Sequence, residues 1–466
     1  MRWQTLGSRG VVFLAVLTAA LIVPWLVMGS GTTDDDATAN MAGVEVDAQG
    51  VLQKKVYADP GGQLMRQRIA AARASQGPQV IAFSKLRKIS LNRLEQAVRD
   101  KGDVLTDEMR YLAGLLRVRY VFYYPDSKDI VLAGPAEGWV TNPAGRVVGI
   151  TSGRPAIQLQ DLVVALRAFP PGKEPTSTIG CSIDPTPEGL SAMQGFLRSM
   201  GSTFAAGQQQ MVAARVTQGL RASMGLQNVS IHGVSPKTHF AQVLVEADYR
   251  MKLIGIGLEQ PPVRMVSFVD QVRPSQVSRN ALFRWYFVPD YQCVRLTPDN
   301  LAMELVGDGV KLVGEDEMVG SGGKRQAAFR SSKASQTFVT SFTRKYSELA
   351  DRSPVYAELR NLIDLAVAAA HIQQQDYYAK AGWKMELFGD EKEFGVQTYN
   401  APKHVESVVA AILRGSQLMT PIGGGVSINA VMALKPENVL ADEKGSVGKL
   451  HDQLKPDLPK GQWWWD

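Results

Sequence analysis

The chain opens on a charge-free apolar run and continues with shorter apolar segments separated by polar ones. Residues 11–29 carry no charge and are mostly Val, Leu, Ala and Ile, with Arg2 and Arg9 before them and three aspartates after them. A basic flank followed by an apolar run is typical of a signal peptide or a membrane anchor, and both alternatives stay open. We therefore expect residues 1–30 to export the rest of the chain.

Beyond residue 50 the apolar positions follow two periods. Short or alternating apolar runs predict strands at 118–124, 130–133, 147–150, 178–183, 229–234, 240–256, 285–288, 293–296 and 302–313. Helical spacing and capping residues predict helices after Ser90 and over 159–169, 187–200, 208–224, 335–349, 354–381 and 405–413. This order of elements predicts an α+β fold, with antiparallel-rich sheets and helices packed on one face.

Breaks in the pattern divide the chain into two or three domains. Phe169–Pro175 holds three prolines and a glycine, and Gly320–Arg325 is rich in glycine, so neither segment favours regular structure. We predict a linker over 31–50, a basic N-terminal α+β domain over 51–172, a central α+β domain over 176–320, a mainly helical C-terminal region over 326–450 packed on the central domain, and an aromatic tail over 451–466.

Composition excludes several classes of site. The 466 residues are 45% hydrophobic and 21% charged, as in ordinary globular proteins. Two cysteines exclude multi-cysteine zinc and iron–sulfur sites, and five histidines leave few ways to build a histidine-rich metal centre, so we expect no cofactor. In the oxidising compartment that export implies, Cys181 and Cys293 form either one disulfide or two buried, unpaired thiols.

Positive charge is concentrated in the predicted N-terminal domain. Residues 51–175 hold 19 Lys and Arg against 11 Asp and Glu, and they are densest between Lys85 and Arg99. Such a region attracts anionic lipids or envelope polymers. We expect a protein or an envelope polymer as partner, and contact with a membrane surface through the N-terminal segment. Export argues against nucleic acid.

Catalytic signatures are missing from the sequence. It contains no H-E-x-x-H, C-x-x-C or G-x-S-x-G motif, and no G-x-G-x-x-G after a strand. His232 and His239 flank a turn that precedes Glu246 and Asp248. This arrangement would suit a metal site or an acid–base cluster or, alternatively, ordinary polar turn histidines. His239, Glu246 and Asp248 are therefore the candidate catalytic residues.

Aromatic side chains gather at the end of the long predicted helix and in the tail. They are Tyr377, Tyr378, Trp383, Trp463, Trp464 and Trp465. Exposed aromatic residues of this kind dock a partner, whereas the alternative is packing within the chain itself.

Four longer segments are similar to a known family. They are Phe240–Gly257, Arg284–Asp290, Leu301–Asp316 and Ser353–Ala370. Together they resemble an uncharacterised family of exported bacterial cell-envelope proteins, classed as a domain of unknown function, over about residues 178–425. The resemblance implies export and a shared core from the middle to the C-terminal part of the chain. It implies no activity and no site residues.

These features predict an exported, non-enzymatic binding or scaffold protein that is periplasmic or attached to the cell envelope through its N-terminal helix. The alternative is an exported hydrolase whose site is assembled from scattered carboxylates and histidine.

Overall fold

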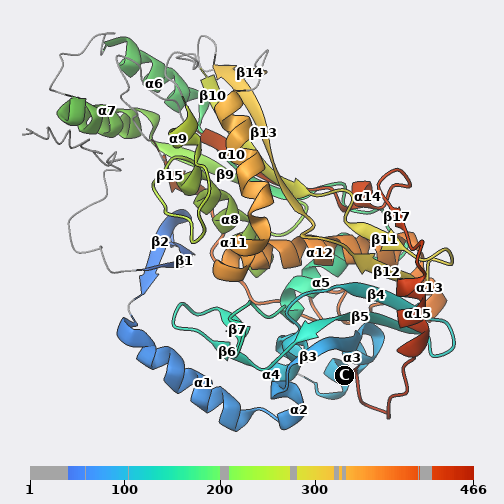
Figure 1. Ribbon diagram of the computed structural model, residues 1–466. Helices are drawn as coiled ribbons and strands as arrows, with labels where there is room; N and C mark the ends of the chain where they lie inside the picture. The colour runs from blue at the N-terminus through green and yellow to red at the C-terminus, as the bar shows by residue number, and fades with distance from the viewer. Residues whose placement is uncertain are drawn as a thin grey trace, which may run out of the picture.

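The computed structural model describes residues 40–57, 59–102, 104–199, 209–272, 281–319, 325–327, 332–407, 409 and 422–466. The predicted export or anchor helix over residues 1–30 lies outside these ranges. Among the described residues, no helix is both long and apolar enough to span a bilayer. The described chain is an α+β fold in which helices lie between and around two large, mainly antiparallel sheets (Figure 1).

The larger sheet of the described chain has nine strands in the order β1-β2-β15-β9-β8-β16-β10-β13-β14. Their bounds, in that order, are Asn40–Val46, Val51–Tyr57, His404–Glu406, Leu226–His232, Ile179–Asp184, Ile422–Ile428, Ala281–Pro289, Val310–Val319 and Arg325–Ala327.

Among the described residues, the second sheet has seven strands in the order β17-β11-β12-β4-β5-β3-β18. Their bounds are Leu440–Ala441, Val294–Leu296, Ala302–Leu305, Tyr120–Tyr124, Asp129–Ala136, Ser84–Ser90 and Trp464–Trp465. A separate hairpin pairs β6 (Trp139–Thr141) with β7 (Val147–Gly149).

The α-helices of the described residues run from α1 to α15. Their bounds are Gln63–Ser75, Pro78–Ile81, Leu91–Asp100, Asp107–Arg110, Leu159–Ala168, Pro187–Ser199, Gln209–Met224, His239–Gly255, Phe268–Gln271, Lys333–Arg344, Tyr346–Arg352, Pro354–Gln374, Tyr377–Ala381, Ala430–Ala433 and Ser446–Gln453. Most predicted helices are therefore present, although the predicted helix over 335–349 divides into α10 and α11.

Helix α12 is the centre of the core. It begins at Pro354, whose missing N–H suits the first turn, and every residue of Val355–Ile372 is buried. Figure 1 shows it crossing the middle of the molecule, and it packs against α5, α8 and α11. Because α12 is surrounded on all sides, its charged residues lie away from water and require partners.

The predicted strand over 302–313 divides into β12 and β13, which lie in different sheets, and the predicted helix over 354–381 divides into α12 and α13. Two other predicted elements have a different type in the structure. The predicted strands over 240–256 are wrong, since these residues form α8, whose first turn is capped by the Thr238 hydroxyl accepting from the Ala241 N–H at 3.2 Å. Fourteen of the 17 residues of α8 are buried, so the apolar pattern does not reveal a single helical face. The predicted helix over 405–413 begins instead as strand β15, and most of its remainder lies outside the described residues.

Both sheets combine distant parts of the chain. The nine-stranded sheet takes β1 and β2 from the N-terminal part, β8–β10 from the middle and β16 from the C-terminal part. The seven-stranded sheet joins β3–β5 to β11 and β12 and ends with β18. The sheets therefore cross the boundaries predicted between the N-terminal, central and C-terminal units.

The predicted docking aromatics pack inside the molecule. Tyr377, Tyr378, Trp383 and Trp463 are buried. Trp464 and Trp465 are half-buried and form β18, antiparallel to β3. These six residues therefore form no exposed docking surface here, and the alternative of packing within the chain describes them.

The two cysteines are free and buried. Cys181 lies on β8 of the nine-stranded sheet, whereas Cys293 precedes β11 of the seven-stranded sheet. Of the two alternatives for this pair, the structure has the unpaired thiols and not the disulfide.

Candidate functional site

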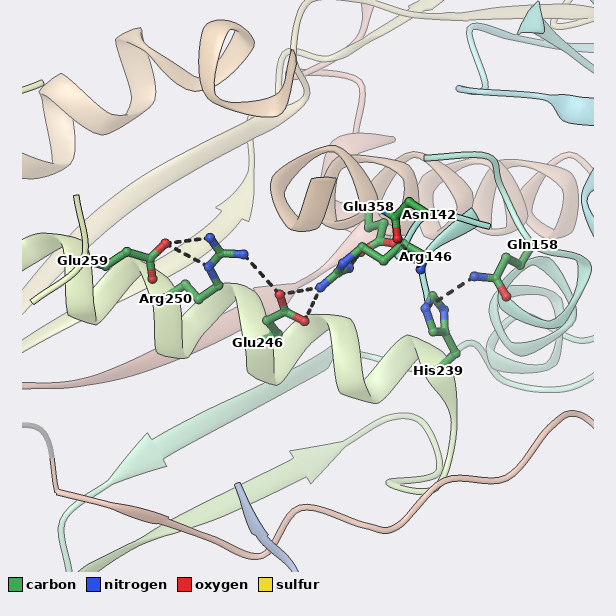
Figure 2. Close-up of polar contacts among 8 residues, drawn as sticks. All are labelled: Asn142, Arg146, Gln158, His239, Glu246, Arg250, Glu259 and Glu358. Atoms are coloured by element: carbon green, nitrogen blue, oxygen red, sulfur yellow. Dashed lines mark hydrogen bonds and ion pairs between the residues drawn. The ribbon is translucent and has the colours of Figure 1, made fainter. Parts of the chain in front are cut away.

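His239 is the first residue of α8, and it pairs with a carboxylate in the first turn of α5. Its Nδ1 lies 2.8 Å from Oδ2 of Asp161. On the other side of the ring, its Nε2 lies 3.4 Å from the side-chain nitrogen of Gln158, a contact drawn in Figure 2. Burial lowers the pKa of His239, but the charge and hydrogen bond of Asp161 more than offset it, so the pKa is raised above its usual value. A carboxylate that orients an imidazole is a recurrent feature of acid–base sites.

Glu246 belongs to a chain of alternating charges that runs along α8. Figure 2 shows the order Glu259, Arg250, Glu246, Arg146 and Glu358. Arg250 is 2.7 Å from Glu259 and 3.4 Å from Glu246, and Arg146 bonds both Glu246 and Glu358. All five side chains are largely buried, so this buried charge chain connects α8 to α12 and to the β6–β7 hairpin.

Strand β1 covers the buried charge chain. A Cβ atom at Gly43 would lie 2.9 Å from Nη2 of Arg146, so the strand backbone passes directly over the guanidinium. Burial raises the pKa of Glu358, and Arg146 opposes that rise. The buried charge chain is therefore a closed network of ion pairs, in which the carboxylates already have cationic partners.

Asp248 lies in a different environment from His239 and Glu246. It is fully buried and pairs with Lys252 at 2.8 Å, while the Lys252 ammonium also donates to the carbonyls of Ile183 at 3.0 Å and Gly424 at 3.2 Å. Burial raises the pKa of Asp248 to about 6, although Lys252 opposes the rise. This pair fastens α8 to β8 and β16, and the structure does not bring the three predicted catalytic residues together in one pocket.

His232, the other turn histidine, lies at the end of β9, opposite Gly180 of β8. A cavity of about 670 Å³ lies beside this turn and is lined by Lys237 and Thr238, but none of the predicted catalytic residues lines it. Within the described ranges, no group of three or more His, Cys, Asp or Glu side chains is placed to hold a metal ion.

A second cavity, of about 620 Å³, has a strongly cationic lining. Its cations are Lys85, Arg117, Arg119, Arg154 and Arg360, and its carboxylates are Asp308 and Asp351. We call it the arginine cleft. Lys85 comes from β3, Arg117 and Arg119 from the segment before β4, and Arg360 from α12. The cleft therefore lies where the seven-stranded sheet meets the central helix.

Three guanidinium groups converge at the floor of the arginine cleft. Arg117 donates from Nε to Asp364 at 2.7 Å and from Nη2 to the Gly307 carbonyl at 2.9 Å. Arg119 reaches the same carbonyl at 3.4 Å. The turn that presents this carbonyl contains Gly307 and Gly309, both with positive φ, a conformation that glycine adopts without strain. The Gly307 carbonyl thus accepts hydrogen bonds from Arg117 and Arg119 and keeps their two positive charges close together.

Arg360 is the most deeply buried of the three, and its charge is only partly compensated. Its Nη1 lies 3.4 Å from Asp308, and its buried Nε has no hydrogen-bond partner among the described residues. Burial, and then the positive charge of Arg117, lower the pKa of Arg360. A buried cation with an unsatisfied donor and a like-charged neighbour favours an anion at the cleft.

Helix α12 supplies charged residues both to the buried charge chain and to the arginine cleft. Each helical residue turns the side chain by about 100°, so Arg360 and Asp364 share one face and Glu358 lies on the opposite one. Sequence reasoning missed Glu358 and Arg360 as functional residues. The available signal was their occurrence as charged residues inside the otherwise apolar segment Val355–Ile372.

Residues 181–268, from β8 to the start of α9, match a family model described as a protein of unknown function (DUF1598). This match confirms the predicted resemblance to a family of unknown function, over a shorter stretch than the predicted 178–425. The matched segment contains His239, Glu246 and Asp248 and none of the residues that line the arginine cleft. No curated protein and no solved structure matches the chain.

Proposed function

We propose that the protein is a non-enzymatic binding module of the cell envelope, exported or anchored by residues 1–30, and that the arginine cleft binds an anionic partner. The observation that carries this proposal is the convergence of Arg117, Arg119 and Arg360 in an open cavity, with an unsatisfied donor on Arg360. The partner is a protein or an envelope polymer that presents anionic groups.

The charges at the rim support reversible binding. Arg154 pairs with Asp351 at 2.7 Å, and both side chains are nearly half-exposed. Exposed pairs of this kind contribute about 0–1 kcal/mol, so an incoming carboxylate or phosphate replaces Asp351 at little cost. Lys85 is exposed and has no ion pair with a described residue. The rim thus offers cations that a ligand can reach without disturbing the fold.

A sedimentation experiment tests the proposal with the full chain. Purified protein is spun with washed bacterial envelopes at low salt, and the bound fraction is compared with that of the Lys85→Glu/Arg119→Glu variant. A matched control carries Lys101→Glu/Lys384→Glu, the same change in charge at exposed positions outside the cleft.

We expect the cleft variant to bind at least about tenfold more weakly, because two attractive contacts become repulsive, and the control to bind nearly as well as the unaltered chain. Equal losses in the two variants would mean that net charge alone drives binding, and that result would refute the cleft as the site.

The Asp161–His239 pair supports a second candidate function, an exported hydrolase in which His239 acts as a general base. Replacing His239 by Gln would then abolish hydrolysis of envelope-derived esters or glycosides, whereas the cleft variant would retain it. If the unaltered chain hydrolyses none of these substrates, the hydrolase hypothesis fails.

A further inference from the structure

An exposed aromatic side chain stands at the arginine cleft. Phe83 is 60% exposed and lines the cavity together with Tyr120. The large hydrophobic side chains exposed in the described chain are Val56, Leu64, Phe83, Val104 and Leu226, and Phe83 is the aromatic one among them. Scattered exposed aliphatic residues are ordinary, but an aromatic face beside converging cations offers two kinds of contact to one ligand.

Hydrogen bonds fix the backbone on the N-terminal side of Phe83. The residue lies in the short connection between α2 and β3, and the buried Arg87 donates to the carbonyls of Gln79 at 2.9 Å, Val80 at 3.1 Å and Ala82 at 3.3 Å. Both carboxylate oxygens of Asp466 accept from the same guanidinium at 2.8 Å. These bonds fix the backbone next to Phe83, so less backbone entropy is lost when a ligand binds there.

The second wall is also rigid. Tyr120 stacks on Phe122, with ring centroids 5.5 Å apart and an angle of 13° between the rings. Phe122 itself is fully buried in the seven-stranded sheet. The arginine cleft thus combines guanidinium groups, which match carboxylate and phosphate oxygens in pairs, with two aromatic side chains on fixed backbone.

We propose that the arginine cleft binds an acidic sugar unit of an envelope polysaccharide, with the sugar's carboxylate or phosphate on Arg119 and Arg360 and the ring face on Phe83. This inference rests on the proposed function and specifies its ligand. A volume of about 620 Å³ suits a ligand of one or a few rings. A single exposed aromatic ring among charged side chains fits a sugar ring better than it fits the long acyl chains of a lipid.

Isothermal titration calorimetry on the full chain distinguishes the possible ligands. The probes are oligogalacturonate, which carries carboxylates on rings, a phosphorylated mannan, a neutral dextran, and poly-L-glutamate, which carries carboxylates without rings. The variants are Phe83→Ala and, as a matched control, Leu226→Ala, which removes an exposed apolar side chain outside the cleft. Thermal melting of each variant verifies folding.

We expect oligogalacturonate or the phosphorylated mannan to bind more tightly than poly-L-glutamate, and the dextran not to bind. The stronger of the two acidic glycans identifies the anionic group. Phe83→Ala should weaken glycan binding about tenfold and leave poly-L-glutamate unaffected, while Leu226→Ala changes neither.

Equal affinity for poly-L-glutamate and the acidic glycans, unchanged in Phe83→Ala, would overturn the sugar assignment and leave an anion-binding cleft. If none of the anionic probes binds, the proposed function fails together with the sugar assignment.

Discussion

Replacing Arg146 by leucine is the sharpest test of how the core tolerates its buried charges. Arg146 is the cation that bonds Glu358, whereas Glu246 also has Arg250 at 3.4 Å. The substitution therefore leaves Glu358 as a buried carboxylate without an ion-pair partner among the described residues. Removing one member of a buried pair costs about 3–5 kcal/mol. That is a large fraction of the roughly 5–15 kcal/mol that usually separates folded from unfolded protein.

The assay is urea unfolding monitored by tryptophan fluorescence, at pH 8 and at pH 5. In the variant the pKa of Glu358 rises further, so the folded state takes up a proton more readily than the unfolded state. Protonation of Glu358 stabilises the folded variant at low pH, and this stabilisation is lost as the pH increases. The variant's loss in free energy of unfolding should therefore be smaller at pH 5 than at pH 8. Arg264→Leu, at an exposed position, serves as the control.

A second substitution makes the reasoning refutable. Adding Glu358→Gln to Arg146→Leu removes the orphaned charge and should restore at least about 1 kcal/mol, as expected for coupled neighbours. A loss below about 1 kcal/mol in Arg146→Leu at pH 8, or a further loss on adding Glu358→Gln, would show that the charge chain does not carry this free energy.

Three further predictions follow from single residues. Gly424→Ala should prevent folding or lower the free energy of unfolding by more than about 3 kcal/mol, because its Cβ would lie 1.9 Å from a backbone carbonyl and its φ is +131°. Gly77 has open space around it, so the control Gly77→Ala should melt near the temperature of the unaltered protein. Alkylation without reductant should label both Cys181 and Cys293 after denaturation and neither in the native state, because both thiols are buried and burial raises the pKa of each. A failure to label the denatured chain would reveal a disulfide. The pKa of His239 is raised in the folded state, so its contribution to stability is complete below pH 6.5 and is lost as the pH rises through the folded-state pKa. The difference in melting temperature between the unaltered chain and His239→Gln should therefore shrink between pH 6 and pH 9. A constant difference would contradict the ion pair.

The predicted α+β class is confirmed, and the error at α8 has a specific cause. The segment Phe240–Ile256 combines β-branched and apolar residues on almost every side, because α8 is packed between the nine-stranded sheet and α12. A pattern of apolar residues identifies a helix only when one face is polar. Charge spacing held the missing information, since Glu246–Arg250 and Asp248–Lys252 are both four residues apart and both pair in the structure.

The arginine cleft could be predicted only in part. The basic excess of residues 51–175 includes Lys85, Arg117 and Arg119, so the sequence indicated the region of positive charge. It did not indicate that Arg360, more than 200 residues further along, would join them. Long-range pairing decides this convergence, and a single sequence does not specify it. The same limit explains why the partners of His239 and Glu246 were not foreseen.

The position of β16 affects how the protein is made. This strand lies between β8 and β10 in the middle of the nine-stranded sheet, although it follows β8 by more than 230 residues. At synthesis rates of roughly 5–20 residues per second, that interval takes on the order of 10–50 s. Until β16 emerges, β8 and β10 each present an unpaired edge, which is a site for aggregation. A chaperone that binds these strand edges until synthesis is complete should therefore reduce aggregation and increase the yield of folded protein.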